Sequence, residues 1–186
     1  ARLKLEERGI LVIKDSSANK GGVISSSLEV LAGLALTDEE YERLMVVRPG
    51  GAIPEFRERY VAEVAATIRR LADAEFRILW EGRKRGGAPL SLLSERLSAK
   101  IDEITRAIDG SALFGNEALR RGAFKRYVPE LLLERIGMDA VFERVPESYQ
   151  RAIFSRAVAS GFVYRYGVDL GFEDYRIFIE ELGSGG

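Results

Sequence analysis

A chain of 186 residues has room for one domain or two small ones and is too short for a large multidomain enzyme. Hydrophobic residues make up 46% of it and charged residues 31%, so the chain can bury a core and whole-chain disorder is excluded. With 28 Lys and Arg against 29 Asp and Glu, the net charge of -1 gives no basic field, and we expect no nucleic-acid partner.

Two residue types are absent, and their absence excludes several classes of chemistry. The sequence contains no cysteine and no histidine, which excludes disulfides, thiol nucleophiles, zinc fingers and histidine acid–base catalysis. It also has no run of about 18 apolar residues and no secretory signal, so we expect a soluble, cytoplasmic protein without a membrane partner. The chain opens at Ala1 and closes on residues 183–186, Gly-Ser-Gly-Gly, so we expect a linker-like tail on a piece of a longer protein.

The N-terminal residues predict a helix, a strand and a second helix. Residues 1–8 suit a short helix that ends at Gly9. The continuous apolar run at 10–13, Ile-Leu-Val-Ile, is typical of a strand buried on both faces of a parallel sheet. One strand cannot pair its own backbone, so this strand predicts an α/β sheet that lies largely outside the chain. The apolar spacing over 23–36 then indicates a mostly buried helix.

The middle of the chain predicts long amphipathic helices. Thr37 and Glu40 form a capping box that starts a short helix to about Val47. Apolar residues recur at steps of three and four over 54–83 and again over 90–108, with a glycine-containing loop between. Two such helices predict a long antiparallel αα-hairpin in which each helix covers the apolar face of the other.

The C-terminal part predicts shorter helices packed on this hairpin. We expect them over 129–136 with a break at Gly137, over 138–145, over 147–166 and over 172–182. Residues 163–168 are a weaker candidate for a second strand. The predicted fold class is therefore mainly α, a helical bundle with one N-terminal strand.

The segment between the predicted strand and the helix is the best candidate for a site. Gly21 and Gly22 let a backbone approach a bound molecule and adopt dihedral angles closed to other residues, while a helix N-terminus presents free N–H groups. A carboxylate or phosphate fits such a place, and the serines at 25–27 add hydroxyls. From the residues alone, a plain turn with one of these serines as the helix cap is the commoner meaning of the pattern.

The same run resembles a known family. It reads Asn19-Lys20-Gly21-Gly22-Val23-Ile24-Ser25-Ser26-Ser27-Leu28-Glu29. This run resembles the segment that closes the substrate cleft in glutamate dehydrogenases and related amino-acid dehydrogenases. The surrounding residues 12–32, and the lysine between Asn19 and Gly21, are similar to the large-subunit NAD-specific glutamate dehydrogenases. The close resemblance covers about residues 1–47 and corresponds to the C-terminal part of the catalytic region.

The resemblance implies roles for five residues. Val23 would line the aliphatic part of the substrate, and Ser26 would hydrogen-bond its side-chain carboxylate. Gly21 and Gly22 would let the backbone come close to the substrate. Asn19 would lie beside the nicotinamide of NAD and the substrate. The resemblance gives this chain no catalytic residue and no metal ligand.

The family's reaction implies what else belongs to the enzyme. A hydride moves from the glutamate Cα to NAD, and the imine is hydrolysed to 2-oxoglutarate and ammonia. The catalytic lysine and aspartate and the dinucleotide fingerprint lie in upstream domains of the family, and this chain has no Gly-x-Gly-x-x-Gly motif. We therefore expect a fragment that is inactive alone, that binds NAD and L-glutamate or 2-oxoglutarate only with the upstream domains of its polypeptide, and that belongs to a homo-oligomer.

The same reading divides the chain into three parts. Residues 1–36 would end a nucleotide-binding α/β domain, 37–182 would form a C-terminal helical region, and 183–186 would be the tail. The alternative is a non-catalytic helical interaction or oligomerisation module, favoured by the long apolar stripes. Two basic groups, at 83–85 and at 120–126, are most simply a solvated loop and helix packing with salt bridges.

Overall fold

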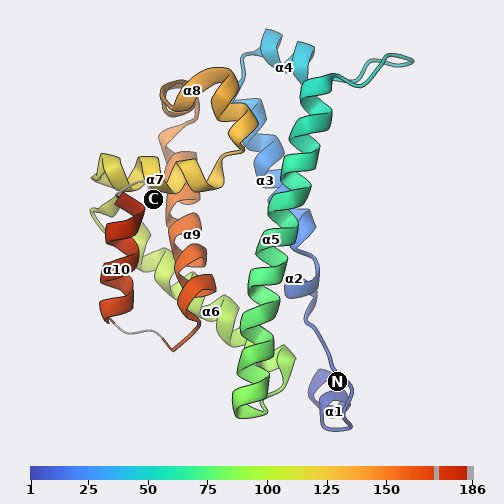
Figure 1. Ribbon diagram of the computed structural model, residues 1–186, viewed down its shortest axis with the longest axis vertical. Coiled ribbons are helices and arrows are strands. Elements are labelled where there is room, and N and C mark those ends of the chain that lie inside the picture. Colours follow the sequence, from blue (N-terminus) through green and yellow to red (C-terminus); the bar gives the residue numbers. More distant parts are fainter. Residues whose placement is uncertain (170–171, 184–186) are drawn as a thin grey trace.

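The computed structural model describes residues 1–169 and 172–183. Of the predicted tail at 183–186, Gly183 is the last residue of a helix, and residues 184–186 lie outside the described residues. Helices dominate the described part of the chain (Figure 1), which confirms the mainly α prediction. They are α1 (Arg2–Glu6), α2 (Asp15–Ala18), α3 (Lys20–Ala35), α4 (Asp38–Leu44), α5 (Glu55–Gly86), α6 (Leu90–Asp109), the 3-10 turn η1 (Leu113–Gly115), α7 (Glu117–Tyr127), α8 (Glu130–Arg144), α9 (Glu147–Tyr166) and α10 (Phe172–Gly183).

Residues 10–14 join α1 to α2 without regular secondary structure. Ile10, Leu11 and Ile13 are 52%, 52% and 44% exposed. The predicted buried strand at 10–13 is therefore not shown: a strand forms only by hydrogen bonding to a neighbour, and no described segment supplies one. The weaker strand candidate at 163–168 is wrong, since α9 continues to Tyr166.

The C-terminal half of α3 lies in the main core. Leu31, Ala32 and Ala35 are fully buried, and α3 packs along α5. Two tyrosines from other helices also reach its backbone. The Tyr60 hydroxyl of α5 donates to the Leu28 carbonyl at 2.7 Å, and the Tyr149 hydroxyl of α9 donates to the Ser27 carbonyl at 3.1 Å. This half of α3 is thus held by both apolar packing and buried hydrogen bonds.

The two long predicted helices are present as α5 and α6, joined by Gly87, Ala88 and Pro89. Gly87 has φ 65°, the left-handed conformation that glycine adopts readily at a helix end. The apolar stripe of α6 packs mainly against α9 rather than α5, and Figure 1 shows α6 leading away from the lower end of α5. The prediction that the hairpin helices cover each other is therefore only partly right, because α9 competes for the α6 stripe.

The C-terminal helices close the other side of the bundle. The predicted break at Gly137 is confirmed, since this residue has φ 79° inside α8. Pro129 gives α8 no side-chain cap, and the Glu63 carboxylate of α5 instead accepts from the backbone N–H groups of Glu130 and Leu131, the latter at 3.1 Å. Helix α10 packs on α9 through Phe178, whose ring lies 5.5 Å from that of Phe162.

Candidate functional site

The start of α3 is closed by Asn19. The Asn19 Oδ1 accepts from the backbone N–H of Gly22 at 3.1 Å, so Asn19 is the N-cap and α3 begins at Lys20. The helix therefore starts three residues earlier than predicted, and the three serines lie inside it. Asparagine is as common as serine at the N-cap position. The signal in the sequence was an asparagine directly before the first residues of the helix, where its side chain can accept from the N–H three residues later, at Gly22.

Gly21 and Gly22 have ordinary right-handed dihedral angles. Neither is among the glycines with positive φ, so the expectation of dihedrals closed to other residues is wrong. The tight position is Gly22, where a Cβ would lie 3.2 Å from Asn19 Nδ2. A Cβ at Gly21 would lie 3.9 Å from Asn19 Oδ1, which is ordinary contact. The glycine at 22 thus makes room for the capping side chain.

Val23 and Ser26 lie one turn apart on the same face of α3. Val23 is 72% exposed, and Ser26 is exposed too. The Ser26 hydroxyl donates to the Val23 carbonyl at 3.0 Å, the local bond that serine commonly makes inside a helix. The structure therefore brings Asn19, Val23 and Ser26 together on an open surface, with an apolar side chain beside a hydroxyl and an amide.

Lys20, three residues before Val23, is bound to the rest of the protein, and its side chain is only 19% exposed. Its ammonium pairs with the Glu75 carboxylate of α5, and the hydroxyl of Tyr164 in α9 donates to Glu75 Oε2 at 2.8 Å. Glu75 is 3% exposed. Burial, followed by the negative charge of Glu75, raises the pKa of Tyr164. Sequence reasoning noted Lys20 but missed both partners, which are far away in the chain and lie within ordinary helical stripes.

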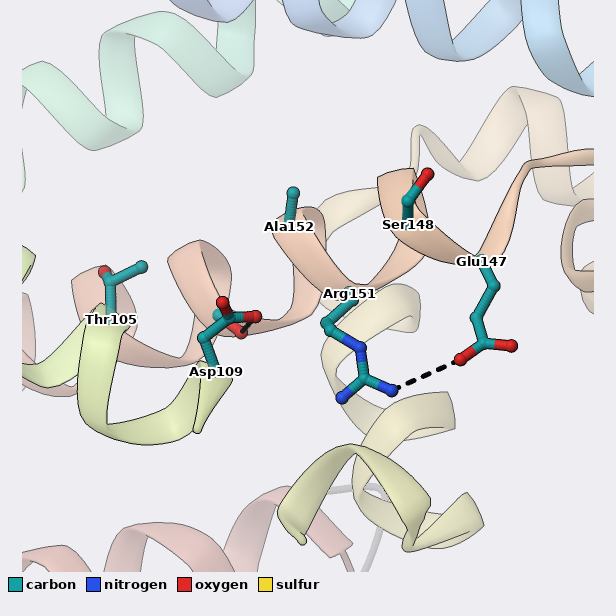
Figure 2. A pocket seen from close by; sticks show the side chains of 7 residues that line it. Thr105, Asp109, Glu147, Ser148, Arg151 and Ala152 are labelled. Carbon is teal, nitrogen blue, oxygen red and sulfur yellow. Dashed lines mark hydrogen bonds and ion pairs between the residues drawn. The ribbon is translucent and has the colours of Figure 1, made fainter. Parts of the chain in front are cut away.

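A shallow pocket of about 490 Å³ lies elsewhere, between α6 and α9. It is lined by Thr105, Asp109, Glu147, Ser148, Arg151, Ala152 and Ser155 (Figure 2). Its charged groups already have partners: Arg151 donates to Glu147 at 3.2 Å, and Asp109 accepts from Ser155 at 3.4 Å. None of the predicted site residues lines this pocket, so it adds nothing to the α3 site.

The acidic residues at the start of α4 stabilise that helix. Thr37 and Glu40 form the predicted capping box, in which the Thr37 N–H donates to Glu40 at 2.9 Å. This backbone bond, with help from Arg144, lowers the pKa of Glu40. Among the described residues, no group of Asp and Glu is arranged to hold a metal ion. In the same part of the chain, no helix is both long and apolar enough to cross a membrane.

The basic groups serve packing and helix ends. Arg83 donates to the carbonyls of Gly87 and Ala88 at 3.2 and 3.1 Å, at the end of α5. Arg120 lies over the Phe142 ring at 4.9 Å, and Arg121 pairs with Asp139 at 2.6 Å. Residues 83–85 therefore lie in the last turn of α5 and not in the predicted loop, while the contacts of Arg120 and Arg121 support the packing interpretation of the second cluster.

Known proteins are similar to this chain at two levels. A family model matches its N-terminal part, and individual relatives match 90–98% of its residues. A sequence model described as Glutamate/Leucine/Phenylalanine/Valine dehydrogenase matches residues 1–87. The chain is 44% identical to "Glutamate dehydrogenase 2" of Dictyostelium discoideum over 182 residues, 98% of this chain and 17% of that protein. It is 46% identical to the "NAD-specific glutamate dehydrogenase" of Neurospora crassa over 167 residues, 90% of this chain and 16% of that protein.

A third relative extends the same pattern. The chain is 35% identical to the "NAD-specific glutamate dehydrogenase" of Saccharomyces cerevisiae over 185 residues, 98% of this chain and 17% of that protein. The chain thus spans only about 16–17% of the length of these relatives. No solved structure matches it.

Proposed function

We propose that the chain is part of an NAD-dependent glutamate dehydrogenase, an enzyme that oxidises L-glutamate to 2-oxoglutarate and ammonium, because it is similar to proteins of that name. The observation that carries the proposal is the identity of 35–46% to such proteins over nearly the whole chain. The exposed face of Val23 and Ser26, next to the Asn19 cap, supports it from the geometry.

The substrate side of the proposal rests on two exposed side chains. Val23 would contact the methylene groups of glutamate, because an exposed apolar side chain gains from covering apolar surface. Ser26 would donate to the distal carboxylate, and to do so it must give up its present bond to the Val23 carbonyl. Nearby free N–H groups at the start of α3 would favour the negative charge.

The cofactor side of the proposal is smaller. NAD, when bound, accepts the hydride from the glutamate Cα. Asn19 is exposed and uses its Oδ1 for the cap, which leaves its amide NH₂ group for a neighbouring nicotinamide. The residues present do not fit the pyrophosphate: Gly21 and Gly22 lie within a helix, and Lys20 is engaged by Glu75. We propose that most of the dinucleotide site, and the catalytic residues, belong to other parts of a longer polypeptide.

The proposed division of the chain follows from this. Residues 1–36 would complete the substrate cleft, and the helices of residues 37–182 would pack against residues 1–36 on the side away from the cleft. Exposed apolar side chains near the N-terminus and on α5 suit contacts with upstream domains or with a second subunit of a homo-oligomer. They are Ile10, Leu11, Ile13, Val30, Phe76 and Trp80.

A test needs the longer polypeptide that extends over the length of the relatives. We expect it to reduce NAD in the presence of glutamate, and Ser26→Ala together with Val23→Asp to lower kcat/KM for glutamate by about 100-fold or more. Ser160→Ala is the matched control, because the Ser160 hydroxyl also donates to a carbonyl of its own helix, at 2.8 Å to Arg156. Wild-type activity in the Ser26→Ala and Val23→Asp double variant would contradict the assignment of the site.

The alternative function, a non-catalytic helical interaction module, is favoured by one observation. Phe76 and Trp80 stack at 5.9 Å on the surface of α5 while 47% and 37% exposed. Light scattering on the longer polypeptide, with and without Trp80→Ser, would test this surface. Self-association without any glutamate-dependent NAD reduction would favour the module over the enzyme.

A further inference from the structure

Glu75 of α5 is a buried carboxylate, and its partners connect it to the candidate site at the start of α3. Glu75 is 3% exposed, and the Lys20 side chain that pairs with it is 19% exposed. A carboxylate removed from water is retained only where charge and hydrogen bonds compensate for the lost hydration. Lys20 supplies the charge, and Tyr164 supplies a hydrogen bond at 2.8 Å.

The network joins three helices at the first turn of α3. Lys20 is the first residue of α3 and stands between the cap, Asn19, and Gly21. Glu75 lies in the second half of α5, and Tyr164 lies near the end of α9. Figure 1 shows the lower end of α3 beside the middle of α5. The buried pair therefore holds the turn that leads into Val23 and Ser26, which lie three and six residues after Lys20.

A second polar contact holds the segment just before this turn. The hydroxyls of Ser17 in α2 and Ser94 in α6 share a hydrogen bond, and Ser94 is fully buried. The segment that contains the cap is thus bonded to α6 on one side of Asn19 and to α5 on the other. Without these contacts the turn would be weak, because two consecutive glycines have low helix propensity.

We propose that Glu75, supported by Tyr164, is a positioning residue for glutamate binding. It acts through Lys20, which holds the first turn of α3 and so fixes the positions of Asn19, Val23 and Ser26. The inference rests on the proposed function for its kinetic consequence. It gives the helical region a definite part in the reaction, since α5 and α9 would set the geometry of a cleft wall that they do not line.

Hydrogen exchange on the 186-residue chain tests whether Glu75 holds the first turn of α3, and it needs no enzymatic assay. The N–H groups of residues 24–26 bond to the carbonyls of residues 20–22, so they report on the first turn of α3. We expect Glu75→Gln to speed their exchange by about tenfold and to leave the amides of residues 155–163 in α9 unchanged. Glu81→Gln is the matched control, because Glu81 pairs with Lys84 at 2.6 Å on the same helix but is exposed.

A second variant keeps the test valid if Glu75→Gln fails to fold. The double variant Glu75→Gln with Lys20→Met removes both charges, which often restores stability because no unpaired charge stays buried. We expect it to fold and still to exchange rapidly at residues 24–26. Exchange at the wild-type rate in either folded variant would overturn the proposal.

Kinetics in the longer polypeptide separate positioning from simple packing. We expect Glu75→Gln to raise KM for glutamate by about tenfold with a smaller fall in kcat, and Glu75→Asp, which keeps the charge, to recover part of the loss. If Glu75 served packing alone, Glu75→Gln, which keeps the shape of the side chain, would keep a KM closer to that of the wild type than Glu75→Asp does. If the wild-type polypeptide reduces no NAD with glutamate, the proposed function fails, and the exchange experiment still decides the positioning. If the wild type is active and both Glu75 variants keep its KM, the positioning role is overturned.

Discussion

The two ends of α3 differ in what holds them. The C-terminal half is enclosed by other helices, with Leu31, Ala32 and Ala35 fully buried. The first turn is open, with Val23 72% exposed, and its hydrogen bonds are mostly local, such as those from Gly22 to Asn19 and from Ser26 to Val23. One helix thus combines a base packed in the core with an end whose side chains are exposed, the arrangement that the proposed substrate contact requires.

The largest effect is expected at the buried half. Leu31→Ala removes a fully buried side chain and leaves a cavity, so it should lower the free energy of unfolding by about 3 kcal/mol. Urea unfolding followed by circular dichroism measures this. Val30→Ala, at a neighbouring position that is 48% exposed, is the control and should cost far less. Equal losses in the two variants would break the contrast between the faces of α3.

We expect the protein to lose stability at high pH because buried tyrosines near α3 have raised pKa values. Burial, followed by the charge of Tyr149, raises the pKa of Tyr127 to about 12. The unfolded state releases this proton near pH 10, so the stabilisation is complete below about pH 10 and is lost as the pH rises through about 12. The slope should reach about 1.4 kcal/mol per pH unit for such a group. Urea midpoints between pH 9 and pH 11 measure it.

Tyr127→Phe is the matched variant for this dependence, since phenylalanine cannot titrate. It should flatten the fall in midpoint above pH 10. A slope identical to that of the wild type would show that the tyrosine does not contribute.

A smaller effect is expected at the cap. Asn19→Ala leaves the N–H of Gly22 without its acceptor and should lower the free energy of unfolding by about 1 kcal/mol. Asn19→Ser keeps a capping oxygen and should recover most of it. Hydrogen exchange should locate the change in the first turn of α3. Exchange that also rises across residues 28–35 would mean that the two ends of α3 are not independent.

The smallest effect is expected at the open face. Val23→Ser changes a side chain that is mostly in water, so the free energy of unfolding should stay within about 0.5 kcal/mol of the wild type. In the longer polypeptide the same substitution should nevertheless weaken glutamate binding. A large loss of stability in the isolated chain would mean that Val23 packs within this chain and is not free to contact a substrate.

The sequence predicted the elements whose stability is local or strongly periodic. The stripes of α5 and α6, the capping box of Thr37 and Glu40 and the break at Gly137 all follow from spacing over a few residues. The predicted strand at 10–13 is not shown, because a continuous apolar stretch becomes a sheet element only beside a neighbouring strand, and no described segment supplies one.

The candidate site was predictable only in part. The pattern around Gly21 and Gly22 located it, but the cap at Asn19 was overlooked in favour of the serines. The Lys20–Glu75 pair and the Tyr164–Glu75 hydrogen bond join residues 55 and 89 positions apart, and each residue looks like an ordinary surface or stripe residue in its own helix. Such contacts depend on how the helices pack, which local spacing does not determine.

Calorimetry with glutamate tests the central claim most directly. The 186-residue chain and the longer polypeptide are each titrated with glutamate in the presence of NADH, which cannot accept a hydride and so prevents turnover during the titration. The account predicts binding only by the longer polypeptide, weakened by Val23→Asp, because this chain supplies one wall of the cleft. Binding by the 186-residue chain alone, or no binding by the longer polypeptide, would contradict it.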